Sequence, residues 1–465
     1  MKTDVLVIGG GPGGHVAAIK AVEYGASAIV VEKYKLGGTC LHQGCIPTKT
    51  LLHTTDVYYE LQHAAAIGLK VDNASVDIEA LQRRKNEIIN TITEGVNAIV
   101  SSKGVEVVYG TAELVSEKQA SVVLNNGETI LIDFDKLILA TGSIPSSIPI
   151  TGANLPNVIT SDDALSLSQV PEALVVIGGG VIGVEFGQLM SRLGAKVSII
   201  EACDNILPHM DAELSSQLAA ELVEEGIDIY TSARVAQIEQ SSGQLNVGFD
   251  IAGELKSIKA EKVLMAVGRK PLVHGFGLEH TRVQIENGAI AVNRYMQTNV
   301  PHIYAIGDCT GGYMLAHVAF KHAMIAAKNI TGDILEPFND LAVPACVYTS
   351  PEFATVGLTE SAASKRFSHI KIGKADLAVN AKTMIVQQRG TVKFVVDTTT
   401  NRVLGLHILG PRASDMIHEA ALALNLNATI DDIVDTIHGH PTIAEGILEA
   451  AEDVFGNAIY KMYNH

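Results

Sequence analysis

Two stretches of the chain share one pattern of hydrophobic and polar positions. Residues 5–14 read VLVIGGGPGG, and residues 174–183 read LVVIGGGVIG. Each begins as an apolar, β-branched run, which favours a buried strand, and passes through GxGxxG into a helix-like segment. Each continues to a second apolar run that ends in an acid, Glu32 or Glu201, which lies 18 residues after the last glycine. The repeat predicts two βαβ units of the Rossmann type, which bind dinucleotides.

The glycines and the acid of such a unit have separate tasks. The first glycine permits a tight turn, the second lets the backbone approach a pyrophosphate, and the third lets the helix pack on the strand. The helix N-terminus then faces the phosphates, and the carboxylate accepts hydrogen bonds from the ribose hydroxyls. Because Glu32 and Glu201 would repel a 2′-phosphate, both sites are predicted to prefer an unphosphorylated ribose. A single GxGxxG is weak evidence, but two copies in register support the interpretation.

Further apolar segments separate and follow the two units. A helix is predicted over residues 77–102 and strands over residues 105–123. The segments LILATGSIP (137–145) and HIYAIGDCT (302–310) each read as a strand that ends in a small-residue turn. We interpret the first as the point where the chain leaves the first domain and the second as its return. The second unit would then be an insertion.

The last quarter of the chain has a different pattern. Short alternating segments in KFVVDTTTNRVLGLHILG predict an antiparallel sheet with a hairpin around residues 398–401. Helices are predicted over residues 413–424 and 444–460.

The composition argues against several classes of protein. Apolar residues make up 47% and charged residues 18%, which is typical of a globular chain and not of a disordered one. Lys and Arg number 34 against 51 Asp and Glu, a net charge of −17, and the lack of any basic run argues against a nucleic-acid partner. The most membrane-like window, residues 173–190, contains three consecutive glycines and Glu185. We therefore expect no membrane span, no membrane partner and a cytoplasmic location.

Two of the five cysteines lie close together, in GGTCLHQGCIPTK. Cys40 and Cys45 can come within disulfide range across one helical turn and a bend. A metal site would need at least two more ligands and only His42 is near, so no metal is predicted. Lys49 lies four residues after Cys45, and a cation beside a thiol favours the reactive thiolate. On spacing alone, a pair of inert buried thiols remains an alternative.

Together these motifs resemble those of the FAD-dependent pyridine-nucleotide disulfide oxidoreductases, over essentially the whole chain. The resemblance is carried by GGTCLHQGCIPTK, LATGSIP, VIGGGVIGVE, AVGRKP, AIGD, MLAH and HGHPTIAE. Within that family, the segment HGHPTIAEGILEAA is most similar to the dihydrolipoamide dehydrogenases. One departure lies between the cysteines, where His42 and Gln43 replace the family's usual asparagine and valine.

The resemblance implies an α/β fold. Two Rossmann-like dinucleotide-binding domains would bind FAD and NAD, and a C-terminal α+β domain would mediate dimerisation. The boundaries expected are residues 1–145 for the FAD-binding domain, 146–270 for the inserted NAD-binding domain, 271–340 for the return to the central part, and 341–465 for the interface domain.

The resemblance also implies cofactor-binding residues. Those implied for FAD are Gly9, Gly11, Gly14, Glu32, Gly38, Thr39, Lys49, Thr111, Gly142, Asp308 and Ala316. Those implied for NAD are Gly178, Gly180, Gly183, Glu185, Glu201, Val235 and Gly268. Lys49 would lie near the flavin N5 and pair with Glu185, which would approach the nicotinamide. Asp308 would accept from a ribityl or ribose hydroxyl, although the sequence alone allows a helix N-cap equally well.

Four residues are implied to be catalytic. Cys45 would lie next to the flavin, Cys40 would exchange with the substrate, His440 would be the acid/base, and Glu445 would orient it. A histidine suits proton transfer from a thiol near neutral pH, and a carboxylate fixes its tautomer. Pro441 is a good first helical residue, so we expect His440 just before a helix and Glu445 just over one turn inside it.

The activity implied is the oxidation of protein-bound dihydrolipoamide by a homodimer, with NAD⁺ as the electron acceptor. The partners implied are lipoyl domains of 2-oxoacid dehydrogenase complexes or the H protein of glycine cleavage. One alternative is a glutathione-type reductase. Glu201, which opposes NADPH, argues against it, as does Val181, where those enzymes usually place a tyrosine. A second alternative is a non-catalytic subunit that holds lipoyl-bearing partners, and the intact cysteine pair argues against that.

Overall fold

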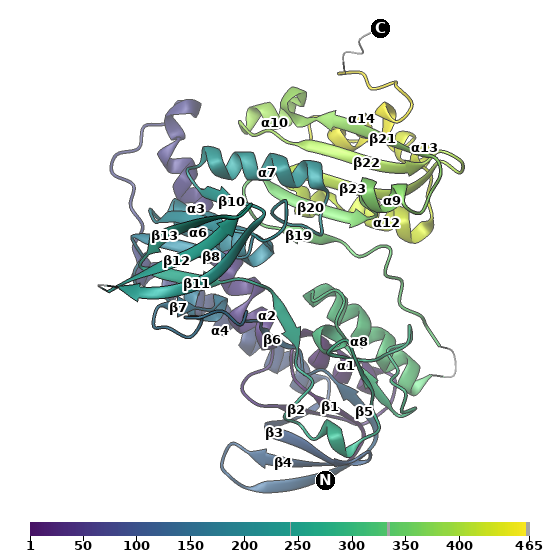
Figure 1. Ribbon diagram of the computed structural model, residues 1–465. Coiled ribbons are helices and arrows are strands. Elements are labelled where there is room, and N and C mark those ends of the chain that lie inside the picture. Colours follow the sequence, from purple (N-terminus) through teal and green to yellow (C-terminus); the bar gives the residue numbers. More distant parts are fainter. Residues whose placement is uncertain (242, 333–334, 462–465) are drawn as a thin grey trace.

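Two mainly parallel sheets and a five-stranded antiparallel sheet lie at the centres of the three lobes of the molecule (Figure 1). The computed structural model describes residues 1–241, 243–332 and 335–461. Among the helices in these ranges, none combines the length and the apolar character needed to cross a bilayer.

The first lobe contains the first GxGxxG. Its strands are β1 (Lys2–Ile8), β2 (Ala28–Glu32), β3 (Glu106–Ser116), β4 (Gln119–Leu124), β5 (Thr129–Leu139), β16 (Ile285–Glu286), β17 (Ala289–Ile290) and β18 (Ile303–Ala305). Its helices are α1 (Pro12–Glu23), α2 (Gly38–Gln43), α3 (Cys45–Gln62), η1 (Ala64–Ile67), α4 (Ile78–Ser102), η2 (Leu278–His280), η3 (Gly307–Thr310) and α8 (Ala316–Thr331). The parallel order is β3–β2–β1–β5–β18, and β4 joins β3 to β5 as an antiparallel meander. The helix and the strands predicted between the two nucleotide units are thus confirmed.

The second lobe contains the second GxGxxG and repeats this plan. Its strands are β7 (Val158–Ile159), β8 (Ala173–Ile177), β9 (Lys196–Ile200), β10 (Asp228–Tyr230), β11 (Ala233–Ser241), β12 (Gln244–Ile251), β13 (Glu254–Ala260) and β14 (Lys262–Met265). Its helices are α5 (Ser161–Ala164), α6 (Val181–Arg192) and α7 (Ala212–Glu224). The parallel order is β10–β9–β8–β14–β7, and β11, β12 and β13 form a separate antiparallel meander.

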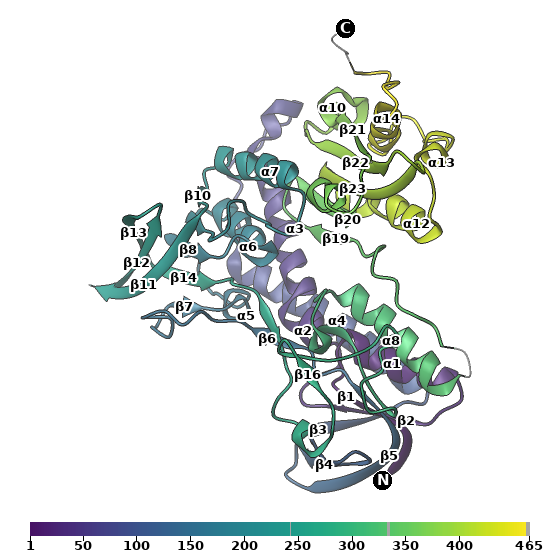
Figure 2. The same cartoon turned by 45° about the vertical axis from the view of Figure 1, so that its right-hand side comes forward.

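Two short strands carry the chain between these lobes. The chain leaves the first lobe through β6 (Ser143–Pro145), which is labelled between the lobes in Figure 2. It comes back through β15 (Arg269–Pro271), which pairs with β6. The return therefore precedes the segment 302–310, which instead forms β18 and η3 within the first lobe. The second unit lies between strands of the first sheet in sequence, as an insertion requires. The exact domain boundaries remain predictions.

The third lobe is an antiparallel sheet with short helices around it. Its strands are β19 (Ala345–Val347), β20 (Glu352–Gly357), β21 (Ile370–Asp376), β22 (Thr391–Asp397) and β23 (Arg402–Gly410), in the order β19–β20–β23–β22–β21. Its helices are α9 (Glu360–Ser364), η4 (Leu377–Val379), α10 (Ala381–Ile385), α11 (Ala413–Met416), α12 (His418–Leu426), α13 (Ile430–Val434) and α14 (Glu445–Asp453). The predicted hairpin between β22 and β23 is confirmed.

Both helices predicted in this lobe are wrong in extent. The first is interrupted at Ile417, between α11 and α12, so it is not continuous over residues 413–424. The second ends at Asp453 instead of reaching residue 460, because the chain turns at Gly456, whose φ of +76° is not helical.

Alternation along the central strands explains why both faces of each parallel sheet are buried. In β1, Val5 and Val7 pack toward helices α1 and α8, whereas Leu6 and Ile8 pack toward the meander. In β8, the residues Leu174 and Val176 face helices α6 and α7, and Val175 and Ile177 face the meander. A run of consecutive apolar residues, 5–8 in β1 and 174–177 in β8, therefore marks the central strand of each unit.

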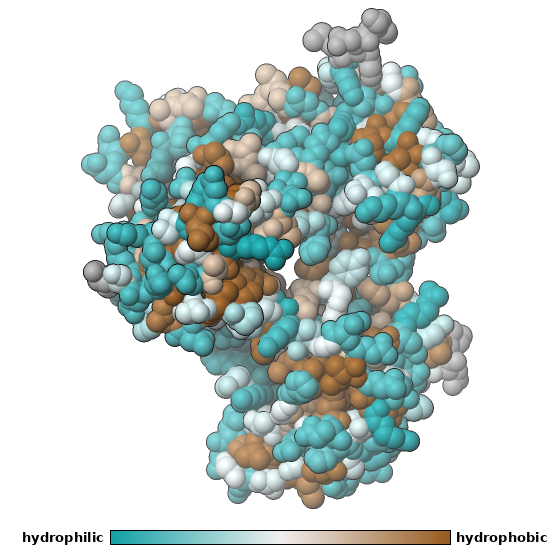
Figure 3. Space-filling model, viewed as in Figure 1, coloured by the Kyte–Doolittle hydropathy of each residue, from teal (hydrophilic) through white to brown (hydrophobic). Residues whose placement is uncertain are grey.

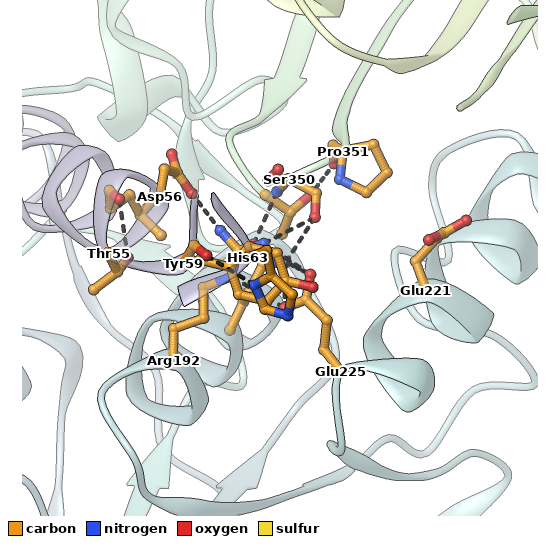
Figure 4. A network of polar contacts seen from close by, with 12 residues as sticks. Thr55, Asp56, Tyr59, His63, Arg192, Glu221, Glu225, Ser350 and Pro351 are labelled. Atoms are coloured by element: carbon orange, nitrogen blue, oxygen red, sulfur yellow. Dashed lines mark hydrogen bonds and ion pairs between the residues drawn. The ribbon is translucent and has the colours of Figure 1, made fainter. Parts of the chain in front are cut away.

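A buried arginine holds the three lobes together (Figure 4). The side chain of Arg192, at the end of α6, is 3% exposed and forms ion pairs with Asp56 of α3 at 2.5 Å and with Glu225 at 2.7 Å. It also lies 4.3 Å from the centre of the Tyr59 ring and donates to the carbonyl of Ser350 in the third lobe. Removal of this one cation would leave carboxylates from two lobes without their partner.

A second buried cation joins the second and third lobes. Lys393 of β22 is 2% exposed and lies 3.1 Å from Asp211, which is 3% exposed and caps α7. Burial by itself lowers the pKa of Lys393, but the hydrogen bonds that its ammonium donates to Glu360 and Glu213 and the charge of Asp211 raise it overall. The ammonium is therefore charged, and the buried Asp211 carboxylate depends on it.

The substitution Lys393→Met is expected to destabilise the protein, because it leaves the Asp211 carboxylate buried without a cation. Loss of one partner of a buried pair costs about 3–5 kcal/mol. We expect calorimetry to show the thermal midpoint lowered by about 5 °C. The control is Lys371→Met, at an exposed position on the adjacent strand β21, which should leave the midpoint unchanged. Equal midpoints for the two variants would contradict this assignment.

Candidate active site

The two cysteines of CxxxxC meet where helix α2 turns into helix α3. Cys40 lies on α2, Gly44 forms the bend, and Cys45 is the first residue of α3. Both are free thiols, joined by a hydrogen bond. That bond from Cys40, together with the charge of Lys49, lowers the pKa of the Cys45 thiol to about 7, although burial opposes the shift. The same bond raises the pKa of Cys40, which favours Cys45 as the thiolate and Cys40 as the hydrogen-bond donor of the pair.

Lys49 connects this pair to the second lobe. It lies one turn after Cys45 on α3, and its ammonium is 2.8 Å from the carboxylate of Glu185 on α6. The Glu185 side chain is 3% exposed and also accepts a hydrogen bond of 3.0 Å from the backbone N–H of Tyr348. The expected pairing of Lys49 with Glu185 is present, and the third lobe contributes to it.

One cavity of about 2550 Å³ contains the cysteines and most of the cofactor-binding residues predicted. It lies where the three lobes meet, and a hollow between the lower lobe and the upper two is visible on the surface (Figure 3). The predicted residues that line it are Gly9, Gly11, Glu32, Gly38, Thr39, Cys40, Cys45, Lys49, Thr111, Gly142, Gly178, Gly180, Glu185, Glu201, Val235, Gly268, Asp308 and Ala316. This volume exceeds the several hundred Å³ typical of a site for one small ligand.

Four predicted residues do not line this cavity. Gly14 and Gly183 instead pack within the turns: a Cβ at Gly14 would lie 1.8 Å from the carbonyl oxygen of Gly9, and one at Gly183 would lie 1.9 Å from that of Gly178. They allow the helix to approach the strand, as expected of the third glycine, without facing a ligand. The other two, His440 and Glu445, lie in the third lobe, at and just before the start of α14, and are not among the residues that line the cavity.

The acids of the two nucleotide units hold their turns in the same way. Glu32 accepts from the N–H of Gly10 at 2.7 Å, and Glu201 accepts from the N–H of Gly179 at 2.6 Å. The second oxygen of each carboxylate accepts from the N–H two residues further along the chain. Each oxygen keeps a lone pair for a ribose hydroxyl. The acids are thus oriented before any ligand binds.

Asp308 lies inside the short helix η3 and not at its N-cap, which is Ile306, so the N-cap alternative is wrong. Its carboxylate accepts from the Ser143 hydroxyl at 2.6 Å. Ser143 in turn accepts from Arg269 at 2.8 Å. The carboxylate at the cavity wall is therefore held by residues of β6 and β15, the two strands that connect the lobes.

His440 and Glu445 form the expected pair, but in a different local structure. Helix α14 begins at Glu445, so Pro441 is not its first residue as predicted. The Glu445 carboxylate accepts from the N–H of Thr442 at 2.8 Å and meets His440 Nδ1 at 2.9 Å, which fixes the turn before the helix. When Nδ1 of the neutral ring donates to Glu445, Nε2 is the nitrogen that can accept a hydrogen bond. The His440 side chain is 72% exposed.

Sequence reasoning missed three residues that shape the site. Ser143 and Arg269 hold Asp308, and the ring of Tyr348 lies against Lys49, with 4.6 Å from the ammonium to the ring centre. No local pattern identifies these contacts, because each joins segments more than 100 residues apart. His42, between the cysteines, bonds to the carbonyl of Leu36 at 2.9 Å.

Comparison with known proteins agrees with this geometry. Residues 3–323 match the family described as pyridine nucleotide-disulphide oxidoreductase, and residues 343–451 match its dimerisation domain. The chain belongs to the pyridine nucleotide-disulfide oxidoreductases. Members of this family are flavoenzymes, and the cofactors of this chain are FAD and NAD(H). The match to the dimerisation domain supports a homodimer.

Individual relatives cover nearly the whole chain. A dihydrolipoyl dehydrogenase of Bacillus subtilis is 40% identical, over 98% of this chain and 99% of its own. The mitochondrial dihydrolipoyl dehydrogenase of Pisum sativum is 37% identical, over 99% and 93%. Among solved structures, LpdA of Mycobacterium tuberculosis has a TM-score of 0.89 at 27% identity, over 97% and 99%. The HOCl-induced flavoprotein disulfide reductase RclA of Escherichia coli has 0.86 at 26%, over the same shares.

The cavity fits two dinucleotides. Both GxGxxG turns open into it, and a Cβ added at Gly142, Gly180 or Gly268 would meet no atom within 4 Å, so the backbone there is open to a ligand. The N-termini of α1 and α6 follow these turns and favour phosphate. We propose that the first-lobe residues hold FAD and the second-lobe residues hold NAD.

Glu201 is expected to make the enzyme prefer NADH to NADPH, because its buried carboxylate would repel a 2′-phosphate. A conflict of about 2 kcal/mol corresponds to about 30-fold or more in kcat/KM. Initial rates with both nucleotides should show this preference, and Glu201→Gln should reduce it. The control Glu239→Gln, an exposed acid of β11, should leave the preference unchanged. Equal kcat/KM values for the unaltered enzyme would refute the assignment.

Proposed function

We propose that the protein is a dihydrolipoyl dehydrogenase, which oxidises protein-bound dihydrolipoamide to lipoamide and reduces NAD⁺ to NADH. The observation that carries the proposal is the cysteine pair inside a cavity for two dinucleotides, with Cys45 held as the thiolate beside Lys49. The full-length relatives that bear this name support the substrate.

The dithiol reaction starts from the oxidised pair, with a bond between Cys40 and Cys45. A substrate thiolate attacks Sγ of Cys40, which breaks that bond and leaves Cys45 as a thiolate. The second substrate sulfur then displaces Cys40, which takes up a proton, and the substrate leaves as a disulfide. The substrate has lost two electrons, and the cysteine pair has gained them. Bound FAD would supply the two-electron carrier that reoxidises the pair and reduces NAD⁺.

The acid/base is proposed to be His440. A substrate thiol must lose its proton before it can attack, and Nε2 of His440 is free to accept it. His440 lies outside the cavity of its own chain, and none of the described residues that line that cavity follows Ala421. We therefore propose that each active site combines Cys40 and Cys45 of one chain with His440 of the partner subunit.

Lipoyl-bearing proteins are the partners that this activity requires. A lipoyl group on a lysine side chain presents a dithiol at the end of a long arm, which suits a reaction deep in a cavity. The proposed partners are lipoyl domains of 2-oxoacid dehydrogenase complexes or the H protein of glycine cleavage. The cytoplasmic location expected from the sequence stays a prediction.

The proposed activity is tested by turnover. The FAD-loaded enzyme should oxidise free dihydrolipoamide with NAD⁺, measured as NADH formation, and glutathione disulfide with NADPH should be a poor substrate pair. Cys40→Ser and Cys45→Ser should each lower kcat by about 10³-fold or more, because each removes one sulfur of the exchange.

Absorbance distinguishes the roles of the two thiols. A thiolate against oxidised flavin gives a long-wavelength band, which Cys40→Ser should show at rest and Cys45→Ser should lack. A band that survives Cys45→Ser would reverse the roles, and no turnover of dihydrolipoamide by the unaltered enzyme would refute the function.

A mixed dimer tests which subunit supplies the base. Homodimers of Cys45→Ser or His440→Ala should be nearly inactive, since loss of a general base costs about 10²–10⁴-fold. When both variants are unfolded and refolded together in equal amounts, half of the dimers are mixed, and each mixed dimer has one intact site. Activity should return to about 25% of the unaltered enzyme. If the base acted within its own chain, no activity would return, although differential tags and the FAD content would show that mixed dimers had formed.

A further inference from the structure

Helices α3 and α6 lie side by side and are joined by two ion pairs. The cation is on α3 in one pair and on α6 in the other. Lys49 of α3 pairs with Glu185 of α6, and seven residues further along both helices Asp56 pairs with Arg192. An aromatic ring lies against the cation at each end. Tyr348 lies 4.6 Å from the Lys49 ammonium. At the other end, Tyr59 lies 4.3 Å from the Arg192 guanidinium, and both residues are drawn in Figure 4. Of the two ion pairs, only Lys49–Glu185 lies next to Cys40 and Cys45.

The backbone around Tyr348 is fixed to α6. Its N–H donates to Glu185 at 3.0 Å, and two residues later the N–H and the carbonyl of Ser350 both bond to the Gln188 side chain at 2.8 Å. Glu185 and Gln188 are one turn apart on the same face of the helix. The backbone from which the Tyr348 ring extends is therefore held by α6 and not by the helix that carries Lys49.

The Tyr348 ring contacts the Lys49 ammonium, and the charge of that ammonium lowers the pKa of Cys45. The other titratable groups around this point are Cys40 from α2, Glu185 from α6, and Cys346 and Glu352 from the third lobe. Burial first, and then the anionic forms of these neighbours, raise the pKa of Tyr348 to about 12, so the phenol is neutral. A neutral ring attracts a cation through its face without adding a charge of its own.

We propose that Tyr348 is a positioning residue of the redox site, whose ring holds the Lys49 ammonium beside Cys45 and so favours the Cys45 thiolate. The Lys49 side chain is 31% exposed and has a strong attraction to Glu185 on one side. Without the ring, water replaces the aromatic face and the ammonium is less confined near the sulfur. The inference rests on the proposed role of Cys45 as the thiolate next to the flavin.

The experiment is a pH titration of the long-wavelength band in the two-electron-reduced, FAD-loaded enzyme. Tyr348→Leu should raise the midpoint of this titration by about half a pH unit, since the thiol then needs a higher pH to lose its proton. Tyr348→Phe keeps the ring and should titrate as the unaltered enzyme does. Tyr59→Leu removes the matching ring at the other end of the helix pair, and it should also leave the midpoint unchanged.

Each outcome bears on the proposal. Equal midpoints for Tyr348→Leu and the unaltered enzyme would overturn it. Equal shifts in Tyr348→Leu and Tyr59→Leu would also overturn it, because they would show general loosening of the helix pair. A shift in Tyr348→Phe would place the effect in the hydroxyl instead of the ring. Absence of the band from the unaltered enzyme would refute the role of Cys45 and the inference with it. FAD content and thermal midpoints, measured for every variant, show that each has folded.

Discussion

The parallel pairing of helices α3 and α6 is the constraint on which the active site depends. The partners in both ion pairs, Lys49 with Glu185 and Asp56 with Arg192, are separated by the same 136 residues. The same separation relates the first residues of the helices, Cys45 and Val181. The pairs therefore bring both helix N-termini to the same level, where both line one cavity. The partial positive charges of the two N-termini act together there, one on a thiol and one on the second nucleotide site.

The two nucleotide units form the glycine turn after their first strand with the same contacts. Gly9 and Gly178 have φ values of +100° and +106°, and an added Cβ would collide with the carbonyl of Ala140 or of Ala266. In both units a carboxylate then accepts two backbone N–H groups around the turn. The units differ in what the rest of the chain adds. In the first unit, Glu32 is followed by helices α2 and α3, which contain the two cysteines. The second unit contains α6, the helix that pairs with α3.

Local patterns in the sequence predicted much of this site, because their physics is local. The turns, their acids and the cysteine pair each depend on residues within one βαβ unit or one helix turn. The contacts of Arg192, Asp308 and Tyr348 could not be predicted in that way, since each depends on how the lobes pack. The pairing of Glu185 with Lys49 was expected. Its hydrogen bond from the backbone N–H of Tyr348 in the third lobe is not indicated by any motif.

One error in the last lobe, the start of its final helix, has a local origin instead. Pro441 has the conformational preference of a first helical residue, but the Glu445 carboxylate competes for the preceding turn. It accepts the N–H of Thr442 and meets His440, so the turn stays outside the helix and α14 begins at Glu445. Helix propensity decides such a boundary only where no side chain offers the backbone another partner. The Glu445 carboxylate, which moves the start of the helix away from Pro441, is also the group expected to orient His440.

The chemical difference between the two cysteines follows from where the backbone places them. Cys45 is the first residue of a long helix and lies beside Lys49, whereas Cys40 lies on the short preceding helix and donates a hydrogen bond to Cys45. Because the pKa of Cys45 is lowered, the reduced pair loses one proton more readily than two separate thiols would, and it then carries a negative charge that the disulfide does not. On reduction, Lys49 changes from the partner of one anion, Glu185, to the partner of two. Burial and Glu185 both oppose that extra charge, so the confinement of Lys49 determines how readily the pair accepts two electrons as thiol and thiolate.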